Sequence, residues 1–141
     1  MLDQELVTKM PKLGFGLMRL PRSDKEKDII DTEQTSQMVD RFLDAGLTYF
    51  DSAYVYNGSE EAAKACLTSR HPRDSYFITS KINVNAKGVV DAEGAKAELA
   101  ESLRREGVDE YCIPFTDLAT TFSKHSKEEQ HSEKKYIRRL K

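Results

Sequence analysis

The segment Leu47-Thr48-Tyr49-Phe50-Asp51-Ser52-Ala53-Tyr54-Val55-Tyr56 joins a short apolar run to a polar end. Its first four residues are typical of a buried β-strand, and Asp51 is the first charged residue after them. Gly46, directly before the run, stands where a helix would end in a left-handed conformation. The segment therefore predicts a strand that closely follows a helix and presents polar side chains at its carboxyl end.

Apolar β-type runs alternate with helical patterns on both sides of this segment. The predicted strands cover residues 12–16, 47–50 and 75–80. The predicted helices run from Thr32 to the stop at Gly46, from Ser59 to the break at His71-Pro72, and roughly from Ala92 to Arg105. A polar stretch, residues 22–31, separates the first strand from the first helix. This order predicts an α/β fold with a parallel sheet.

The helix ends and faces carry recognisable signals. Asp31 and Gln34 are spaced as a capping pair, and Ser59 is the expected N-cap of the second helix, with acids in its first turn. The predicted buried faces are Met38, Val39, Phe42 and Leu43 in the first helix, Ala62, Ala63, Cys66 and Leu67 in the second, and Ala95, Leu99 and Leu103 in the third.

Two architectures fit this alternation, an open doubly wound sheet or a (β/α)₈ barrel. The stretch Gly14-Phe15-Gly16-Leu17-Met18-Arg19 lacks the third glycine of a dinucleotide-binding fingerprint, and no helix follows it directly. Polar residues at the carboxyl ends of strands build the active site of a barrel. The sequence therefore favours a partial (β/α)₈ TIM barrel, roughly its first three to four βα units, within residues 1–122.

Asp51, Tyr56 and Lys81 lie at or just past two of these predicted strand ends. Neighbouring strands lie about 5 Å apart, so the three side chains can converge. A lysine ammonium beside a tyrosine favours the phenolate, which eases proton donation to a carbonyl oxygen. Asp51 would pair with Lys81 and orient it. Hydride must come from a cofactor, because no side chain supplies one.

Composition and sequence patterns indicate which kinds of partner to expect. The net charge of −2 favours neither nucleic acid nor an anionic membrane surface, and no apolar run is long enough to span a bilayer. The first residues lack the pattern of a signal peptide. Cys66 and Cys112 have no metal-ligand spacing and are expected to be buried reduced thiols, and His125 and His131 do not fit a zinc motif. We expect a cytoplasmic protein without a metal.

Residues 12–109 resemble the N-terminal portion of the aldo-keto reductase family. The Asp-x-Ala-x-x-Tyr pattern is formed here by Asp51, Ala53 and Tyr56. The segments that complete the resemblance are Leu13-Gly14-Phe15-Gly16, Leu17-Met18-Arg19-Leu20-Pro21, Asn57-Gly58-Ser59-Glu60 and Ile78-Thr79-Ser80-Lys81. The resemblance implies a (β/α)₈ barrel that reduces small aldehydes or ketones reversibly with NAD(P)H, usually NADPH. It implies Tyr56 as acid/base, Lys81 tuning it, Asp51 supporting Lys81, and cofactor contacts at Asp51 and Gly16.

The resemblance weakens after Asp109. By count, Asp117 occupies the position of a histidine that ends the fourth strand of the family, and Pro114 falls inside that strand. Residues 123–141 form a charged stretch expected to be a solvated or disordered tail. A complete barrel needs about 250 residues. We therefore expect a truncated reductase or, alternatively, a non-catalytic barrel fragment or interaction module. Its open half-barrel could self-associate.

Overall fold

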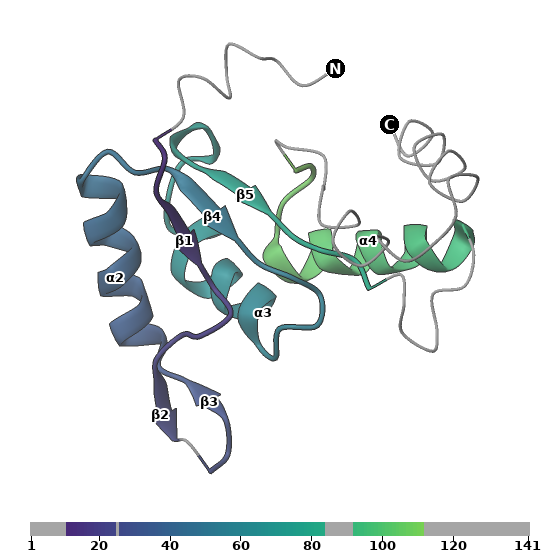
Figure 1. The fold of residues 1–141 in the computed structure, drawn as a ribbon, viewed down its shortest axis with the longest axis horizontal. Coiled ribbons are helices and arrows are strands. Elements are labelled where there is room, and N and C mark those ends of the chain that lie inside the picture. Colours follow the sequence, from purple (N-terminus) through teal and green to yellow (C-terminus); the bar gives the residue numbers. More distant parts are fainter. Residues whose placement is uncertain (1–10, 25, 84–91, 112–141) are drawn as a thin grey trace.

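The computed structural model describes residues 11–24, 26–83 and 92–111 (Figure 1). In chain order the elements are β1 (Gly14–Gly16), β2 (Arg22–Asp24), β3 (Ile29–Ile30), α2 (Thr32–Asp44), β4 (Tyr49–Asp51), α3 (Ser59–Ala63), a π-helical turn (Lys64–Thr68), a 3₁₀ turn (Arg73–Ser75), β5 (Phe77–Thr79) and α4 (Ala92–Glu106). The predicted alternation of strands and helices is confirmed. The predictions for Cys112, Pro114, Asp117 and the charged tail lie outside the described residues.

A parallel sheet with the strand order β1-β4-β5 forms the centre of the fold. Its register places Gly16 beside Asp51, and Asp51 beside Thr79. Because the three strands run in one direction, as the arrows in Figure 1 show, their carboxyl ends share one edge of the sheet. Asp51 lies at that edge on the middle strand.

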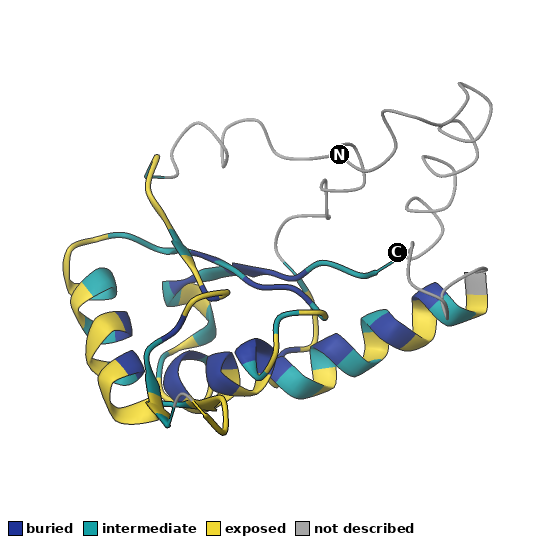
Figure 2. Ribbon diagram, turned by 60° about the horizontal axis from the view of Figure 1, so that its bottom comes forward, coloured by how far each residue is buried: buried dark blue, intermediate teal, exposed yellow. Residues whose placement is uncertain are grey.

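The helices α2, α3 and α4 lie on one side of this sheet (Figure 2). The aromatic rings of Phe15, Phe42 and Phe50 contact one another there, with centroids between 5.2 and 5.5 Å apart. Leu67 and Ile78 are fully buried in the same cluster. Burial of these side chains supplies the main driving force for packing helices on strands. The core therefore fixes the strands whose ends carry the polar residues.

The first helix begins as its sequence predicts, because the Asp31 carboxylate accepts a hydrogen bond from the backbone N–H of Gln34 at 2.9 Å. Its end is also as predicted, since Gly46 is left-handed with φ +74°. Its buried face differs in one residue. Val39 is fully buried, whereas Met38 is 38% exposed and Thr35 takes its place in the core.

We expect Asp31→Ala to lower the free energy of unfolding by about 1 kcal/mol, because the first turn of α2 loses its side-chain cap. Urea unfolding followed by circular dichroism measures the change. Asp44→Ala is the matched control at the other end of α2, where an acid opposes the helix dipole. Equal destabilisation by the two variants would contradict the capping role of Asp31.

The start of α3 corrects the prediction that Ser59 is its N-cap. Gly58 is the N-cap, with φ +70° and no side-chain hydrogen bond, and Ser59 is the first helical residue. A left-handed backbone at this point suits glycine. The hydroxyl of Ser59 is thereby turned into the protein, where it meets the hydroxyl of Ser52 at 2.8 Å. Ala62, Ala63, Cys66 and Leu67 are buried, as predicted.

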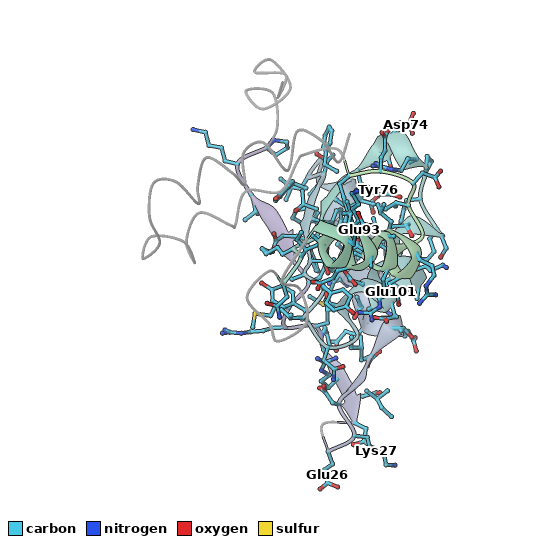
Figure 3. The ribbon with its side chains drawn as sticks, turned by 90° about the vertical axis from the view of Figure 1, so that its right-hand side faces the viewer. Glu26, Lys27, Asp74, Tyr76, Glu93 and Glu101 are labelled. Carbon is cyan, nitrogen blue, oxygen red and sulfur yellow. The ribbon has the colours of Figure 1, made fainter. Side chains whose placement is uncertain are left out.

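The polar stretch between β1 and α2 forms a hairpin that sequence reasoning missed. β2 and β3 pair antiparallel, and Asp28 in the connecting turn is left-handed with φ +55°. Glu26 and Lys27 lie at its tip, away from the sheet (Figure 3). Strands this short and polar give no apolar alternation to detect. The hairpin follows the carboxyl end of β1 in the chain, and its turn contacts the loop after β4 through Asn57 and Asp28.

Candidate active site

An ion pair joins the carboxyl ends of β4 and β5. The Lys81 ammonium donates to both oxygens of the Asp51 carboxylate, at 2.7 and 2.6 Å, and to the backbone carbonyl of Ser52 at 2.9 Å. Sheet register brings the two residues together, because Asp51 ends β4 beside Thr79 and Lys81 follows two residues later. All three protons of the ammonium thus have acceptors. Two consecutive residues at the end of β4 therefore fix its position.

The environment favours the charged form of Lys81. Burial alone would lower the pKa of its ammonium, but the hydrogen bonds and negative charge of Asp51 outweigh burial and raise that pKa above its usual value. The side chain is 20% exposed. A positive charge is therefore held in a partly buried position beside Asp51.

Tyr56 joins this pair from the loop after β4. The Lys81 ammonium lies 5.1 Å from the centroid of the Tyr56 ring, within the range of a cation–π interaction. Two backbone hydrogen bonds hold the loop, from Tyr56 N–H to the Ala53 carbonyl at 2.9 Å and from Ser59 N–H to the Tyr56 carbonyl at 3.0 Å. The structure thus brings together the three side chains that the sequence singled out.

Gly16 lies in the same row as Asp51. The two residues are register partners on β1 and β4, so their backbones are adjacent at the carboxyl edge of the sheet. A Cβ added at Gly16 would meet no atom within 4 Å. The space outward of Gly16 is therefore open, and its backbone is adjacent to that of Asp51.

The β2–β3 hairpin supports the loop that carries Tyr56. The Asn57 amide donates a hydrogen bond to the Asp28 carboxylate, which also pairs with the Arg22 guanidinium at 2.9 Å. A Cβ at Gly58 would come within 3.1 Å of Ile30, so the chain passes close to β3 there. These contacts tie Tyr56 to the connection between β1 and α2.

Two buried acids beneath the site were not expected from the sequence. Glu60 is 1% exposed and accepts a hydrogen bond from the Ser80 hydroxyl at 2.5 Å, and Glu106 is fully buried. Neither oxygen of Glu106 makes a hydrogen bond with any described group. Burial and the charge of Glu60 raise the pKa of Glu106 to about 8, although the hydroxyls of Tyr111 and Ser52 act in the opposite direction.

Within residues 11–24, 26–83 and 92–111, no three His, Cys, Asp or Glu side chains are grouped to hold a metal ion. Cys66 is a buried free thiol, as the sequence predicts, and contacts the backbone carbonyl of Thr32 at 3.4 Å. In this part of the chain, no helix has the length and apolar character that crossing a membrane requires.

The fold and the strand-end cluster define an α/β protein of the parallel-sheet class, with its polar residues gathered at the carboxyl edge. The family model described as "Aldo/keto reductase family" matches residues 12–129. The chain belongs to that family, whose members are oxidoreductases. The predicted membership is confirmed.

Individual relatives agree with this assignment. The aldo-keto reductase Str7 of Strobilurus tenacellus is 31% identical over 113 residues, which is 79% of this chain and 33% of that protein. An NAD/NADP-dependent indole-3-acetaldehyde reductase of Schizosaccharomyces pombe is 32% identical over 97 residues, 69% of this chain and 30% of that protein. The chain spans about a third of the length of these curated relatives.

A solved structure supports the fold. The aldo-keto reductase of Klebsiella pneumoniae in complex with NADPH superimposes with a TM-score of 0.54 at 24% identity, over 72% of this chain and 33% of that one. At this identity the likeness concerns the fold. It agrees with a parallel sheet covered by helices.

Proposed function

We propose that this chain carries the acid–base centre of an NAD(P)H-dependent reductase of small aldehydes or ketones. The observation that supports this most directly is the Lys81 ammonium, held by both oxygens of Asp51 and lying 5.1 Å from the Tyr56 ring centroid. Family membership supports oxidoreductase chemistry for such a centre. The proposal assigns a role to each of the three side chains.

In this proposal Tyr56 is the general acid. Its hydroxyl donates a proton to the carbonyl oxygen of the substrate, and the nearby Lys81 ammonium stabilises the phenolate that remains. Asp51 keeps the ammonium in place and charged. In the reverse direction the phenolate accepts the proton from an alcohol. Lys81 thus acts on the proton transfer without leaving its ion pair.

The cofactor would supply hydride to the carbonyl carbon when bound. Asp51 and Gly16 are the residues proposed to contact it, because they are register partners at the carboxyl edge of the sheet and the space outward of Gly16 is open. The cofactor class agrees with the printed name of the Schizosaccharomyces pombe relative, an NAD/NADP-dependent reductase. NADPH is the form proposed from the family resemblance.

We further propose that residues 1–122 correspond to the first three to four βα units of a (β/α)₈ barrel, followed by a charged tail at 123–141. The sheet β1-β4-β5 with helices on one side agrees with the first three units. In the described residues neither β1 nor β5 pairs with a further strand. Such edges attract other strands. They therefore support a second candidate function, a non-catalytic module that associates with another chain or with its own copy.

NADPH binding and molecular mass, measured on the same sample of the full chain, test these two candidates. Isothermal titration gives the binding constant, and light scattering gives the mass. We expect saturable micromolar binding, weakened by Asp51→Asn and unchanged by Asp44→Asn at the end of α2. Absence of NADPH binding at millimolar concentration would remove the reductase proposal and favour the module, whose mass would show whether it self-associates.

A further inference from the structure

The two residues that flank the ion pair are both fastened to the first turn of α3. Ser52 follows Asp51 in the chain, and its hydroxyl meets that of Ser59 at 2.8 Å. Ser80 precedes Lys81, and its hydroxyl donates to Glu60 Oε1 at 2.5 Å. Ser52, Ser59 and Glu60 are all at most 1% exposed. Consecutive residues of one helical turn thus hold the ends of both strands that carry the site.

A second route connects Glu60 to Lys81 through Arg105 and Tyr54. Glu60 Oε2 makes no hydrogen bond with a described group and lies 3.6 Å from the guanidinium of Arg105. That guanidinium also pairs with Glu101 at 2.8 Å and with Glu61 at 3.6 Å. It stacks over the Tyr54 ring with its central carbon 4.4 Å from the centroid. The backbone N–H of Tyr54 in turn donates to the Lys81 carbonyl at 2.9 Å. Glu60 therefore acts on the residue before Lys81 and on the group that holds the Lys81 backbone.

A carboxylate in this place needs a reason beyond packing. Burying a charged group is costly unless it is paired and hydrogen-bonded, and an apolar residue would fill the first turn of α3 at lower cost. Both identified partners of the Glu60 carboxylate, Ser80 and Arg105, belong to routes that reach Lys81. Its neighbour Glu61 is exposed, so acidity in this turn could be supplied without burial.

We infer that Glu60 is a positioning residue, which uses Ser80 and Arg105 to hold the end of β5 so that Lys81 stays between Asp51 and Tyr56. The inference rests on the proposed function for its consequence in catalysis, whereas its structural effect on Lys81 is independent of turnover. Its substitution changes the exposure and ion pairing of the Lys81 ammonium without removing any of the three proposed catalytic side chains.

The reactivity of Lys81 toward acetic anhydride, measured by mass spectrometry of the full chain, reports the exposure and ion pairing of the Lys81 ammonium directly. The exposed Lys96 is the internal reference in the same sample. Glu60→Leu removes the acceptor for Ser80, Glu60→Gln keeps it, and Glu33→Gln, an exposed acid in the first turn of α2, is the control. We expect Glu60→Leu to raise the relative labelling of Lys81 about tenfold, as loss of a buried hydrogen bond to a charged group implies. Glu60→Gln and Glu33→Gln are expected to stay within about threefold of the wild type.

Circular dichroism identifies variants that fail to fold. If Glu60→Leu fails to fold, Ser80→Ala replaces it as the test variant. It removes the same hydrogen bond from the strand side and should raise Lys81 labelling in the same direction. Unchanged labelling in folded Glu60→Leu, or in Ser80→Ala when Glu60→Leu does not fold, would overturn the inference. Labelling requires neither cofactor nor turnover. Absence of reductase activity in the wild type would therefore refute the proposed function, but the labelling of Lys81 would still test the role of Glu60.

Discussion

Lys81→Met is expected to lower the turnover number for carbonyl reduction by about a thousandfold, within the range of general acid–base contributions. Methionine has a similar length but no ammonium, so nothing stabilises a phenolate at Tyr56. The change also leaves the Asp51 carboxylate without the partner that binds both its oxygens. Initial rates of NADPH oxidation with an aromatic aldehyde measure the loss.

Lys96→Met is the matched control, because Lys96 is an exposed lysine of α4 paired only with Glu93 among the described residues. It should retain the wild-type turnover number. A turnover number for Lys81→Met within threefold of wild type would contradict the role of the ammonium.

Because the pKa of Lys81 is raised, its ion pair stabilises the fold at neutral pH and loses that contribution only as pH rises above the ordinary lysine value.

Glu106→Leu is expected to stabilise the fold, and the gain should increase with pH. The Glu106 carboxyl is fully buried, and neither of its oxygens hydrogen-bonds to a described group. Replacing an unsatisfied polar group by an apolar one should add about 1–3 kcal/mol at pH 5. The pKa of about 8 means that the folded protein keeps a proton which the unfolded chain loses above the ordinary value of 4.5.

The sign of the pH dependence follows from that difference. Between the two pKa values unfolding releases a proton, so the free energy of unfolding of the wild type falls by about 1.4 kcal/mol for each pH unit. The fall ends near pH 8, where the folded protein also ionises. Glu106→Leu lacks this group, so its advantage over the wild type should be about 4 kcal/mol larger at pH 8 than at pH 5.

Urea unfolding at several pH values measures this advantage, and Glu110→Gln, an exposed acid of the same segment, is the control. Glu106→Gln keeps the size of the side chain but cannot titrate, so it should lose the same pH dependence without the full gain in stability. A difference between wild type and Glu106→Leu that is constant from pH 5 to pH 8 would contradict the buried, protonated state of Glu106.

Local signals in the sequence were enough to predict the strands of the parallel sheet, the helices and the three proposed site residues, but not the β2–β3 hairpin. The cap at Asp31 and the left-handed Gly46 depend on neighbours within a few residues, and both are confirmed. Asp51 and Lys81 could be brought together in advance because parallel strands place their carboxyl ends at one edge. The catalytic roles of these residues stay predictions until they are tested.

The buried acids could not be predicted, because their burial depends on contacts between segments that are distant in the sequence. Glu60 and Ser80 are 20 residues apart, and the first-turn position of Glu60 suggested only an acid that favours the helix dipole. In α4 the repeat of Ala95, Leu99 and Leu103 predicted the buried face, but only Ala95 of these three is buried, whereas Leu99 and Leu103 are partly exposed. The line of buried residues continues instead through Glu98, Ser102 and Glu106. A charged residue on an expected solvent face gives no local sign of burial.

Carbonyl reduction by the full chain and its Tyr56→Phe variant, followed by NADPH oxidation, tests the proposed acid–base centre most directly. Tyr49→Phe serves as the control. It removes the hydroxyl of Tyr49 in β4, which hydrogen-bonds to the Thr79 hydroxyl. The proposal predicts turnover in the wild type and in Tyr49→Phe, and a loss of at least about a hundredfold in Tyr56→Phe. Equal turnover in Tyr56→Phe and the wild type, or no turnover in the wild type with NADPH bound, would contradict it.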